Sequence, residues 1–258
     1  MAVSEPLYGK NPAELAALCA ETGLPRFAAR QLARWLYVKH IEDPMLMTDI
    51  PAARRALLAE RFRQVLTPPE RVTESADGTK KYLFRTQQGA YIESAYIPDG
   101  DRATLCVSSQ AGCRMGCRFC ASTQAGRVRN LEAGEICSEI YTAQKDIGER
   151  ISHIVLMGIG EPLDNRVNVL RFLQLVNHPE GLNIGMRHIS LSTCGVVPGI
   201  DALAEENLQL TLSVSLHAPD SATRSRIMPV NNAYDVEELF AACHRYFKKT
   251  GRRISFEY

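Results

Sequence analysis

Hydrophobic residues recur at helical spacing over the first 65 residues of the chain. A first helix opens at Asn11-Pro12, where proline is tolerated, and is interrupted at Gly23-Leu-Pro25. Apolar residues from Phe27 to Leu36 mark a second helix, and residues 52–65 predict a third. The N-terminal part of the chain is therefore expected to be helical.

The pattern changes after Pro68-Pro69, which marks a boundary. Residues 80–85 and 90–97 are predicted to form paired strands, with turn residues before and between them. From residue 104 onward, short apolar segments alternate with longer amphipathic ones. The predicted strands are 104–109, 152–158, 188–193, 209–216 and 253–258. The predicted helices are 132–148, 165–177, 199–206 and 235–249.

This alternation of strands and helices is typical of βα units that build a parallel sheet, so the fold class is α/β. Every chemically suggestive motif of the chain falls at the carboxyl end of a predicted strand. Barrels and open sheets of this class place their active sites at that end. We therefore expect one site, assembled from several strand ends.

The composition of the chain further limits the class of protein to which it can belong. The 258 residues are 45% hydrophobic, enough for a sizeable core, and no stretch approaches the 18 apolar residues that a membrane span needs. The N-terminus lacks a signal-peptide pattern, so we expect a cytoplasmic protein that does not associate with membranes. Eight cysteines in such a protein indicate metal or redox chemistry rather than a disulfide scaffold.

The net charge of +1 says little about nucleic acid, but the charge is unevenly distributed. Five arginines and no acidic residue lie between Arg102 and Glu132. Such a stretch suits a polyanionic substrate, and it is equally consistent with arginines that pair with acidic residues elsewhere in the fold.

Cys113, Cys117 and Cys120 form a C-x3-C-x2-C run within one short segment. Three thiolates in one loop can hold three irons of a [4Fe–4S] cluster and leave the fourth iron open to a substrate or cofactor. Zinc sites usually combine two cysteine pairs, and no second pair exists here. The remaining alternative, three unrelated buried cysteines, is disfavoured because free thiols rarely crowd in this way.

Four motifs around this run resemble the RlmN/Cfr family of radical S-adenosylmethionine (SAM) RNA methyltransferases, and they occur in the family's order. They are Thr104–Gln110, Gly158–Pro162, Ser190–Gly195 and Ser213–Pro219. The likeness extends from about Pro12 to the last residue. It implies methylation of adenine carbon 2 in 23S rRNA and tRNA through a methyl-cysteine intermediate. It also implies a [4Fe–4S] cluster, SAM and an electron donor such as flavodoxin or ferredoxin, and we expect a monomer.

The resemblance implies a partial (βα)6-type barrel that is incomplete after its fifth strand. It divides the chain into a small N-terminal helical domain (1–68) that contacts RNA, a β-hairpin connector (69–103) and the partial barrel (104–258). Arg30, Arg34 and Lys39 could lie on the polar side of the N-terminal helices and face the RNA. A solvated face of a helical bundle is at least as good an explanation for any one of them.

The resemblance also assigns roles to individual residues. Cys113, Cys117 and Cys120 are the implied cluster ligands. Residues of the strand-end motifs are implied to contact SAM, and they are Gly160, Glu161, Ser192, Ser215, Leu216 and His217. Taken alone, the glycine-rich segment is an ordinary turn and His217 is a core or capping histidine. Cys194 stands where the family commonly has serine, and no role follows from it.

Two further residues carry implied catalytic roles. Cys106 matches a cysteine that resolves a covalent protein–RNA adduct by forming a disulfide with the methyl-carrying cysteine. Taken alone, it would be a buried structural cysteine. Glu93 matches the family's proton acceptor by position only, since a carboxylate on a strand normally faces solvent.

One departure from the family concerns the end of the chain. The sequence stops at Tyr258, whereas the family continues through a sixth strand to its methyl-carrying cysteine. None of the eight cysteines is assigned that role, and Cys243 is expected in the core of a helical stretch. We therefore expect this chain to bind the cluster and SAM without completing methyl transfer.

Two alternatives remain open from the residues alone. One is methylation of adenine carbon 8 of 23S rRNA, as in the Cfr branch of the family. The other is a noncatalytic, metal-stabilised RNA-binding module.

Overall fold

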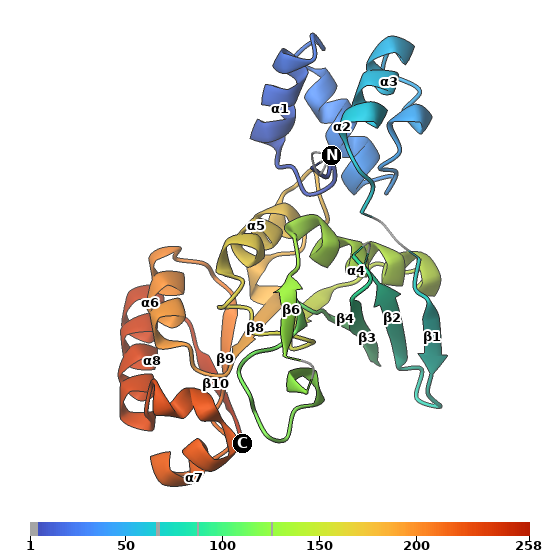
Figure 1. The fold of residues 1–258 in the computed structure, drawn as a ribbon. Coiled ribbons are helices and arrows are strands. Elements are labelled where there is room, and N and C mark those ends of the chain that lie inside the picture. Colours follow the sequence, from blue (N-terminus) through green and yellow to red (C-terminus); the bar gives the residue numbers. More distant parts are fainter. Residues whose placement is uncertain (1–4, 66–67, 87, 125) are drawn as a thin grey trace.

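The computed structural model describes residues 5–65, 68–86, 88–124 and 126–258 (Figure 1). Its N-terminal part contains helices α1 (Pro12–Glu21), α2 (Ala28–Tyr37) and α3 (Ala52–Arg61), with a short 3-10 turn at Pro44–Leu46. The start of α1 is fixed by a capping box, in which the Asn11 side chain accepts from the Glu14 amide and the Glu14 side chain accepts from the Asn11 amide. The three predicted helices are confirmed, although α3 ends four residues early because Phe62 adopts an extended conformation.

The rest of the molecule is organised around an eight-stranded sheet with the order β1-β2-β3-β4-β7-β8-β9-β10. Strands β4 and β7 to β10 run parallel, which confirms the five strands predicted from the alternating pattern. These strands are β4 (Arg102–Cys106), β7 (His153–Leu156), β8 (Ile189–Thr193), β9 (Thr211–Ser215) and β10 (Ile254–Glu257). The fold is α/β with an N-terminal helical region, as predicted.

The segment predicted as a hairpin connector continues this sheet. It forms the antiparallel strands β1 (Arg71–Glu74), β2 (Lys80–Arg85) and β3 (Tyr91–Asp99), and β3 pairs with β4. The connector is therefore the edge of the sheet that carries the parallel strands.

The crossover helices are those that the periodicity predicted. They are α4 (Ala133–Ile147), α5 (Arg166–Asn177), α6 (Val197–Glu205) and α8 (Val236–Thr250). Helix α4 packs on α5, and α6 packs on α8 (Figure 1). The sequence did not predict α7 (Ser221–Ile227), nor the ribbon of β5 (Gln110–Gly112) and β6 (Arg127–Asn130), nor three further 3-10 turns. The 3-10 turns are Ala121–Thr123, Met186–His188 and Pro229–Asn232.

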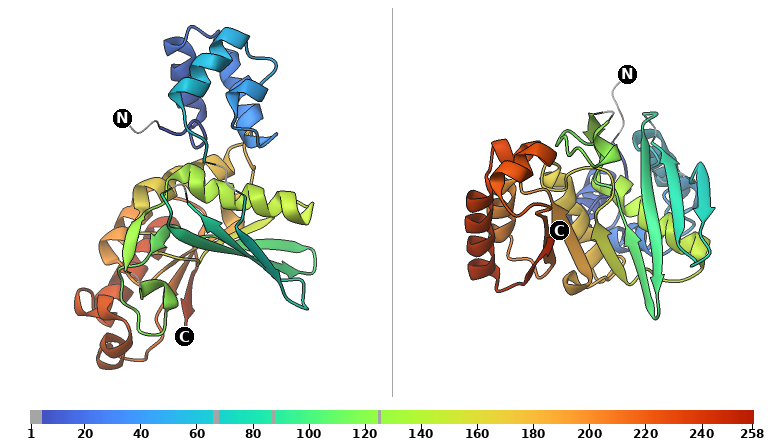
Figure 2. Two further views of the ribbon diagram at one scale, coloured as in Figure 1. Left: turned by 45° about the vertical axis from the view of Figure 1, so that its right-hand side comes forward. Right: turned by 90° about the horizontal axis from the view of Figure 1, so that it is seen from below.

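The N-terminal helices lie at the opposite end of the sheet from the loop that follows β5 (Figures 1 and 2). They contact the crossover helices α4 and α5. The ring of Tyr8 packs against Tyr37 of α2 and Tyr141 of α4, with ring centroids 5.3 and 5.4 Å away. Arg171 of α5 donates through Nε to the carbonyl of Gly9 at 2.7 Å.

Candidate active site

A cavity of about 220 Å³ opens at the carboxyl ends of β7, β8 and β9. The loop that follows β5 covers it and contributes three cysteines. The lining includes Cys113, Cys117, Cys120, Gly158, Gly160, Glu161, Ser192, Thr193, Cys194 and Ser215. Seven of the predicted site residues thus meet in one cavity, formed by segments that are up to about one hundred residues apart in the chain.

The start of the cysteine loop is held in a conformation that needs glycine. Gly112 has φ +71°, and a Cβ there would lie 1.9 Å from the carbonyl oxygen of Gly126. Further along, the Arg118 amide donates to the Ile227 carbonyl of α7 at 2.9 Å. The loop is therefore fixed at both places by backbone contacts.

Asp164 anchors the same loop to the segment after β7. Its carboxylate accepts from Gln110 at 2.8 Å, from Arg127 at 3.2 Å and from Arg114. Burial alone would raise the pKa of Asp164, but the hydrogen bonds from Gln110 and Arg114, together with the arginine charges, outweigh burial and lower it.

The three loop cysteines are close enough to influence one another. Burial, together with the smaller effect of the neighbouring Cys113 and Cys120, raises the pKa of Cys117 to about 11. All eight cysteines of the chain are free, so the structure contains no disulfide, including at Cys106. Within the described residues, no three cysteine, histidine or acidic side chains converge on a position for a single metal ion. Three thiols around a wider cavity suit a multi-iron cluster better than one zinc ion.

Glu161 is a buried carboxylate at the end of β7, held by backbone amides. Its Oε1 accepts from the Leu163 amide at 3.0 Å, and its Oε2 accepts from the Cys194 amide at 2.8 Å. Burial raises the pKa of Glu161, while these amide hydrogen bonds act in the opposite direction. Next to it, Gly160 has φ +106°, and a Cβ there would lie 2.5 Å from the Gln110 side chain. A cation such as an ammonium group would find a preorganised carboxylate here.

The sequence did not single out Arg224, a fully buried arginine of α7 that fixes the strand ends around the cavity. Its guanidinium donates to the carbonyls of Cys194 (2.6 Å), Ser215 (3.1 Å) and Leu216 (3.2 Å). It also donates to the side chain of Asn231 at 3.1 Å. A lone arginine in a polar segment gives no sequence signal, since its role depends on which backbone carbonyls the fold brings to it.

Leu216 and His217 lie beside the cavity rather than in its lining. Their backbone amides both donate to the Glu257 carbonyl at 3.0 Å. His217 has φ +53°, and its ring packs edge-on against Phe119 of the cysteine loop, with centroids 4.9 Å apart. These residues therefore join β9, β10 and the cysteine loop.

Cys106 and Glu93 also lie outside the lining of the cavity, on neighbouring strands. Cys106 pairs with Ala95 of β3, so Glu93 is its diagonal neighbour on the same face. The Met157 amide, which lies at the cavity, hydrogen-bonds to the Cys106 sulfur, but burial dominates and raises the pKa of Cys106 to about 11. Glu93 forms an ion pair with Lys81 at 2.8 Å.

Acidic partners account for much of the arginine-rich stretch. Arg114 and Arg127 pair with Asp164, and Arg129 pairs with Glu135 at 2.6 Å. Of the two interpretations of this stretch, pairing within the fold therefore explains three of the five arginines.

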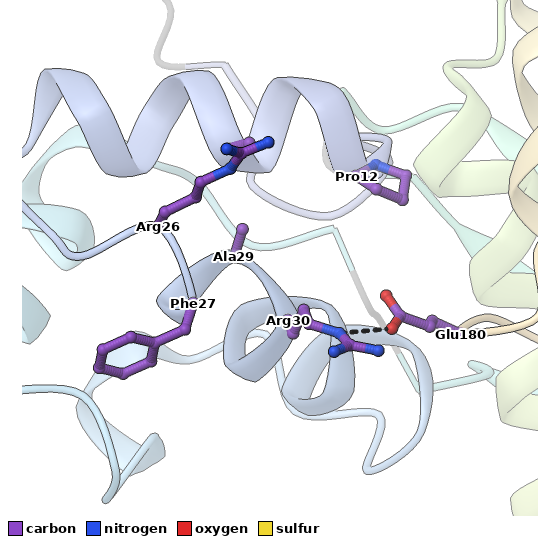
Figure 3. A pocket seen from close by; sticks show the side chains of 7 residues that line it. Pro12, Arg26, Phe27, Ala29, Arg30 and Glu180 are labelled. Atoms are coloured by element: carbon purple, nitrogen blue, oxygen red, sulfur yellow. Dashed lines mark hydrogen bonds and ion pairs between the residues drawn. The ribbon is translucent and has the colours of Figure 1, made fainter.

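A second hollow, of about 530 Å³, lies between α1, α2 and the segment after α5 (Figure 3). Phe27 and Arg26 stand on its rim, and Arg30 pairs with Glu180 at 2.9 Å (Figure 3). Phe27 is 65% exposed. None of these residues borders the cysteine cavity. Within the described part of the chain, no helix is both long enough and apolar enough to cross a membrane.

Five parallel strands, a three-cysteine loop and a carboxylate at the end of β7 define a radical SAM protein. The family model of the radical SAM superfamily matches residues 107–255. A solved structure, a radical SAM methyltransferase from Sphaerobacter thermophilus, is similar with a TM-score of 0.92 and 43% identity, covering 98% of this chain and 76% of that one. The cofactors of this class are a [4Fe–4S] cluster and SAM.

The more particular family follows from the N-terminal helices and from the curated relatives. The model of the ribosomal RNA large subunit methyltransferase N-terminal domain matches residues 6–63. A probable dual-specificity RNA methyltransferase RlmN from Symbiobacterium thermophilum is 49% identical over 98% of this chain and 69% of its own length. The corresponding protein of Clostridium acetobutylicum is 47% identical over 98% of this chain and 74% of its own length. The chain belongs to the RlmN family of radical SAM RNA methyltransferases.

Proposed function

We propose that this protein methylates carbon 2 of adenine in 23S rRNA and tRNA through a methyl-cysteine intermediate, and the methyl-carrying cysteine is none of the eight cysteines of these 258 residues. The observation that carries the proposal is the single cavity in which three cysteines meet the carboxylate of Glu161 at the carboxyl ends of parallel strands. The dual-specificity RlmN relatives favour carbon 2 over carbon 8 and favour two kinds of RNA substrate.

The residues that line the cavity suggest which of them would bind the cluster and which would bind SAM. Cys113, Cys117 and Cys120 would each bind one iron of the cluster, which supplies the electron for reductive cleavage of SAM. The Glu161 carboxylate would hold the amino group of SAM. The remaining SAM contacts would be made by Gly160, Ser192, Ser215, Leu216 and His217. Gly160 lines the cavity with backbone alone, since a side chain there would collide with Gln110, and Ser192 and Ser215 offer hydroxyl groups at neighbouring strand ends.

Cys106 and Glu93 would act on the RNA. The Cys106 thiol would attack the sulfur of the methyl-carrying cysteine, so that a disulfide forms and the bond from that sulfur to the RNA carbon breaks. The electron pair of the broken bond would go to the RNA, whose methylene takes up a proton to become the methyl group, and Glu93 would accept the proton that leaves the adenine ring. Their diagonal placement on β3 and β4 allows both to face the same substrate. The ion pair with Lys81 would have to loosen for Glu93 to do so.

The N-terminal helical domain (1–68) would contact RNA away from the reacting base, and the rim of the second hollow is suited to it. Phe27 offers an exposed ring on which a base could stack, and Arg26 offers a positive charge for phosphate. We further propose a cytoplasmic monomer reduced by flavodoxin or ferredoxin, with residues 69–103 connecting the helical domain to the barrel (104–258).

The noncatalytic metal-binding module is the weaker alternative. Such a module would need convergent ligands for a single ion, and none occur among the described residues. It would also have no use for the buried carboxylate of Glu161 beside the cysteines.

The experiment is anaerobic incubation of the reconstituted protein, expressed from its complete reading frame, with SAM, a reductant and unmethylated rRNA or tRNA. We expect 5′-deoxyadenosine, and 2-methyladenosine in the digested RNA. Glu161→Ala should weaken SAM binding by about tenfold, because the lost contact is a charged hydrogen bond. The control is Glu205→Ala, an exposed glutamate of α6. Detection of 8-methyladenosine instead of 2-methyladenosine would show that the enzyme methylates carbon 8. Binding of zinc without any formation of 5′-deoxyadenosine would overturn the assignment as an enzyme.

A further inference from the structure

Glu139 is a fully buried glutamate of α4 that lies between this helix and the sheet. Its Oε2 accepts from the Ser108 amide at 3.0 Å and from the Ser94 hydroxyl. Its Oε1 has no hydrogen-bond partner within the described residues. A leucine would fill this space without the cost of burying a carboxyl group, so packing alone gives no reason for a glutamate here.

The partners of Glu139 flank the two residues proposed to act on RNA. Ser94 follows Glu93 directly on β3, and Ser108 comes two residues after Cys106, just beyond the end of β4. Serine 94 is buried while Glu93 is half-exposed, so the two side chains lie on opposite faces of the strand. Glu139 therefore forms hydrogen bonds with β3 and with the residue that follows β4, on the face of the sheet opposite to Glu93.

Ser108 extends this connection to the SAM-binding segment. Its hydroxyl donates to the Glu93 carbonyl at 2.7 Å and accepts from the Ile159 amide at 3.0 Å. Ile159 lies two residues before Glu161. One serine thus joins the strand of Glu93, the end of β4 and the segment that carries Glu161, and its own amide is held by Glu139.

We propose that Glu139 is a positioning residue for Cys106 and Glu93, acting through Ser94 and Ser108. The proposal rests on the proposed function, because only that function gives Cys106 and Glu93 a role. A shift of about 1 Å in a reacting group can cost up to about a hundredfold in rate, so a rigid support behind two adjacent strands has a clear use.

The titratable groups near the Glu139 carboxyl group are consistent with its position behind Cys106 and Glu93. Burial raises the pKa of Glu139 well above its ordinary value. Burial is also the main cause of the raised pKa of Cys106, and Glu139 adds to it once ionised. The other titratable groups that face Glu139 are Glu135 and Cys137, both on α4.

The test is the rate at which iodoacetamide alkylates Cys106 in the cluster-loaded protein, followed by peptide mass spectrometry from pH 7 to 11. Glu139→Ala removes the support, and Glu139→Gln keeps an oxygen acceptor but cannot ionise. Cys137→Ala is the matched control, since Cys137 is buried on the same helix and is no partner of Ser94 or Ser108. Formation of 5′-deoxyadenosine is measured in parallel.

We expect Glu139→Ala to raise the alkylation rate at pH 8 by about tenfold, because the end of β4 opens more often. Glu139→Gln should alkylate at a rate close to that of the wild type, since its side-chain oxygen can still accept from Ser94 and Ser108. Cys137→Ala should follow the wild type. If Glu139→Ala does not fold, Ser94→Ala takes its place, with a smaller increase expected.

An unchanged alkylation rate in Glu139→Ala, or equal increases for the alanine variants of Glu139 and Cys137, would overturn the positioning role. If the wild-type protein forms no 5′-deoxyadenosine, this result would instead count against the proposed function. The two failures are therefore distinguishable.

Discussion

The strand-end cavity and the N-terminal hollow offer polar groups to a ligand in two different ways. In the cavity, the carboxylate of Glu161 is buried and both of its oxygens accept backbone amides. In the hollow, Phe27 and Arg26 project from the surface, and the Arg30 side chain, 81% exposed, forms an ion pair with Glu180 (Figure 3). The cavity is preorganised, whereas the hollow can adapt to its partner.

The difference matches the chemistry expected at each place. Radical chemistry on SAM requires reacting atoms in a fixed geometry, which buried and fully hydrogen-bonded groups provide. Contact with folded RNA requires charge and stacking surface that tolerate several shapes, which exposed side chains provide. Substitutions in the cavity should therefore have large effects and those around the hollow small ones.

The largest effect is expected from replacing Cys113, Cys117 and Cys120 together with alanine. The wild type should bind about one [4Fe–4S] cluster after anaerobic reconstitution, and the triple variant none, because no thiolate remains in the loop. Iron and sulfide analysis with the visible absorption spectrum measures this. The control is Cys19→Ala with Cys243→Ala, since both cysteines are buried away from the cavity. Full iron and sulfide in the triple variant would contradict the assignment.

The sequence predicted the residues that line the cavity better than the residues that hold them in place. Spacing alone was enough to single out the three cysteines that line the cavity, because they lie within eight residues of one another. The five parallel strands were visible because each is a short apolar run and the first four are each followed by an amphipathic helix. The boundaries were less accurate, as at α3, where one extended residue ends the helix early.

What sequence could not predict is the set of polar contacts made at long range. Arg224 and Asp164 hold the cavity through partners that come from other strands and loops, so neither belongs to a local motif. Helix α7 was missed for a related reason, since its seven residues contain only Ala222 and Ile227 as apolar positions. Its one buried residue is Arg224, an identity that predicts an exposed position.

Arg224→Met should give the next largest effect. The change would leave the carbonyls of Cys194, Ser215 and Leu216 buried without their donor, and we expect a loss of about 3 kcal/mol or more in the free energy of unfolding. Denaturant titration of the cluster-free protein measures it. The control is Arg226→Met, since Arg226 is exposed on the same helix. Equal stability of the two variants would show that the cavity does not depend on the buried guanidinium.

Asp164→Asn probes the anchor of the cysteine loop, and its effect should depend on pH. The folded-state pKa of Asp164 is lowered, so the carboxylate contributes stability above its ordinary value of 3.8, and this contribution is lost as the pH falls through the folded pKa. At pH 7 we expect the variant to lose about 1 kcal/mol, because both arginine partners are partly exposed. The difference should shrink below pH 3.8. Asp201→Asn, which breaks an exposed pair with Arg245, should lose less.

The smallest effect is expected at the hollow, from Phe27→Ala. Stacking of a base on an aromatic ring contributes about 1 kcal/mol at the lower end of its range, so RNA affinity should fall by about fivefold. Melting temperature should not change, because Phe27 is 65% exposed and buries little apolar surface. Fluorescence anisotropy with a labelled RNA hairpin measures the affinity, and Leu46→Ala, also at an exposed apolar residue of the N-terminal helices, is the control. A loss of affinity equal to that of Leu46→Ala would mean that the hollow has no special contact with RNA. A fall of a hundredfold would contradict the contrast itself, since the hollow would then bind as specifically as the preorganised cavity.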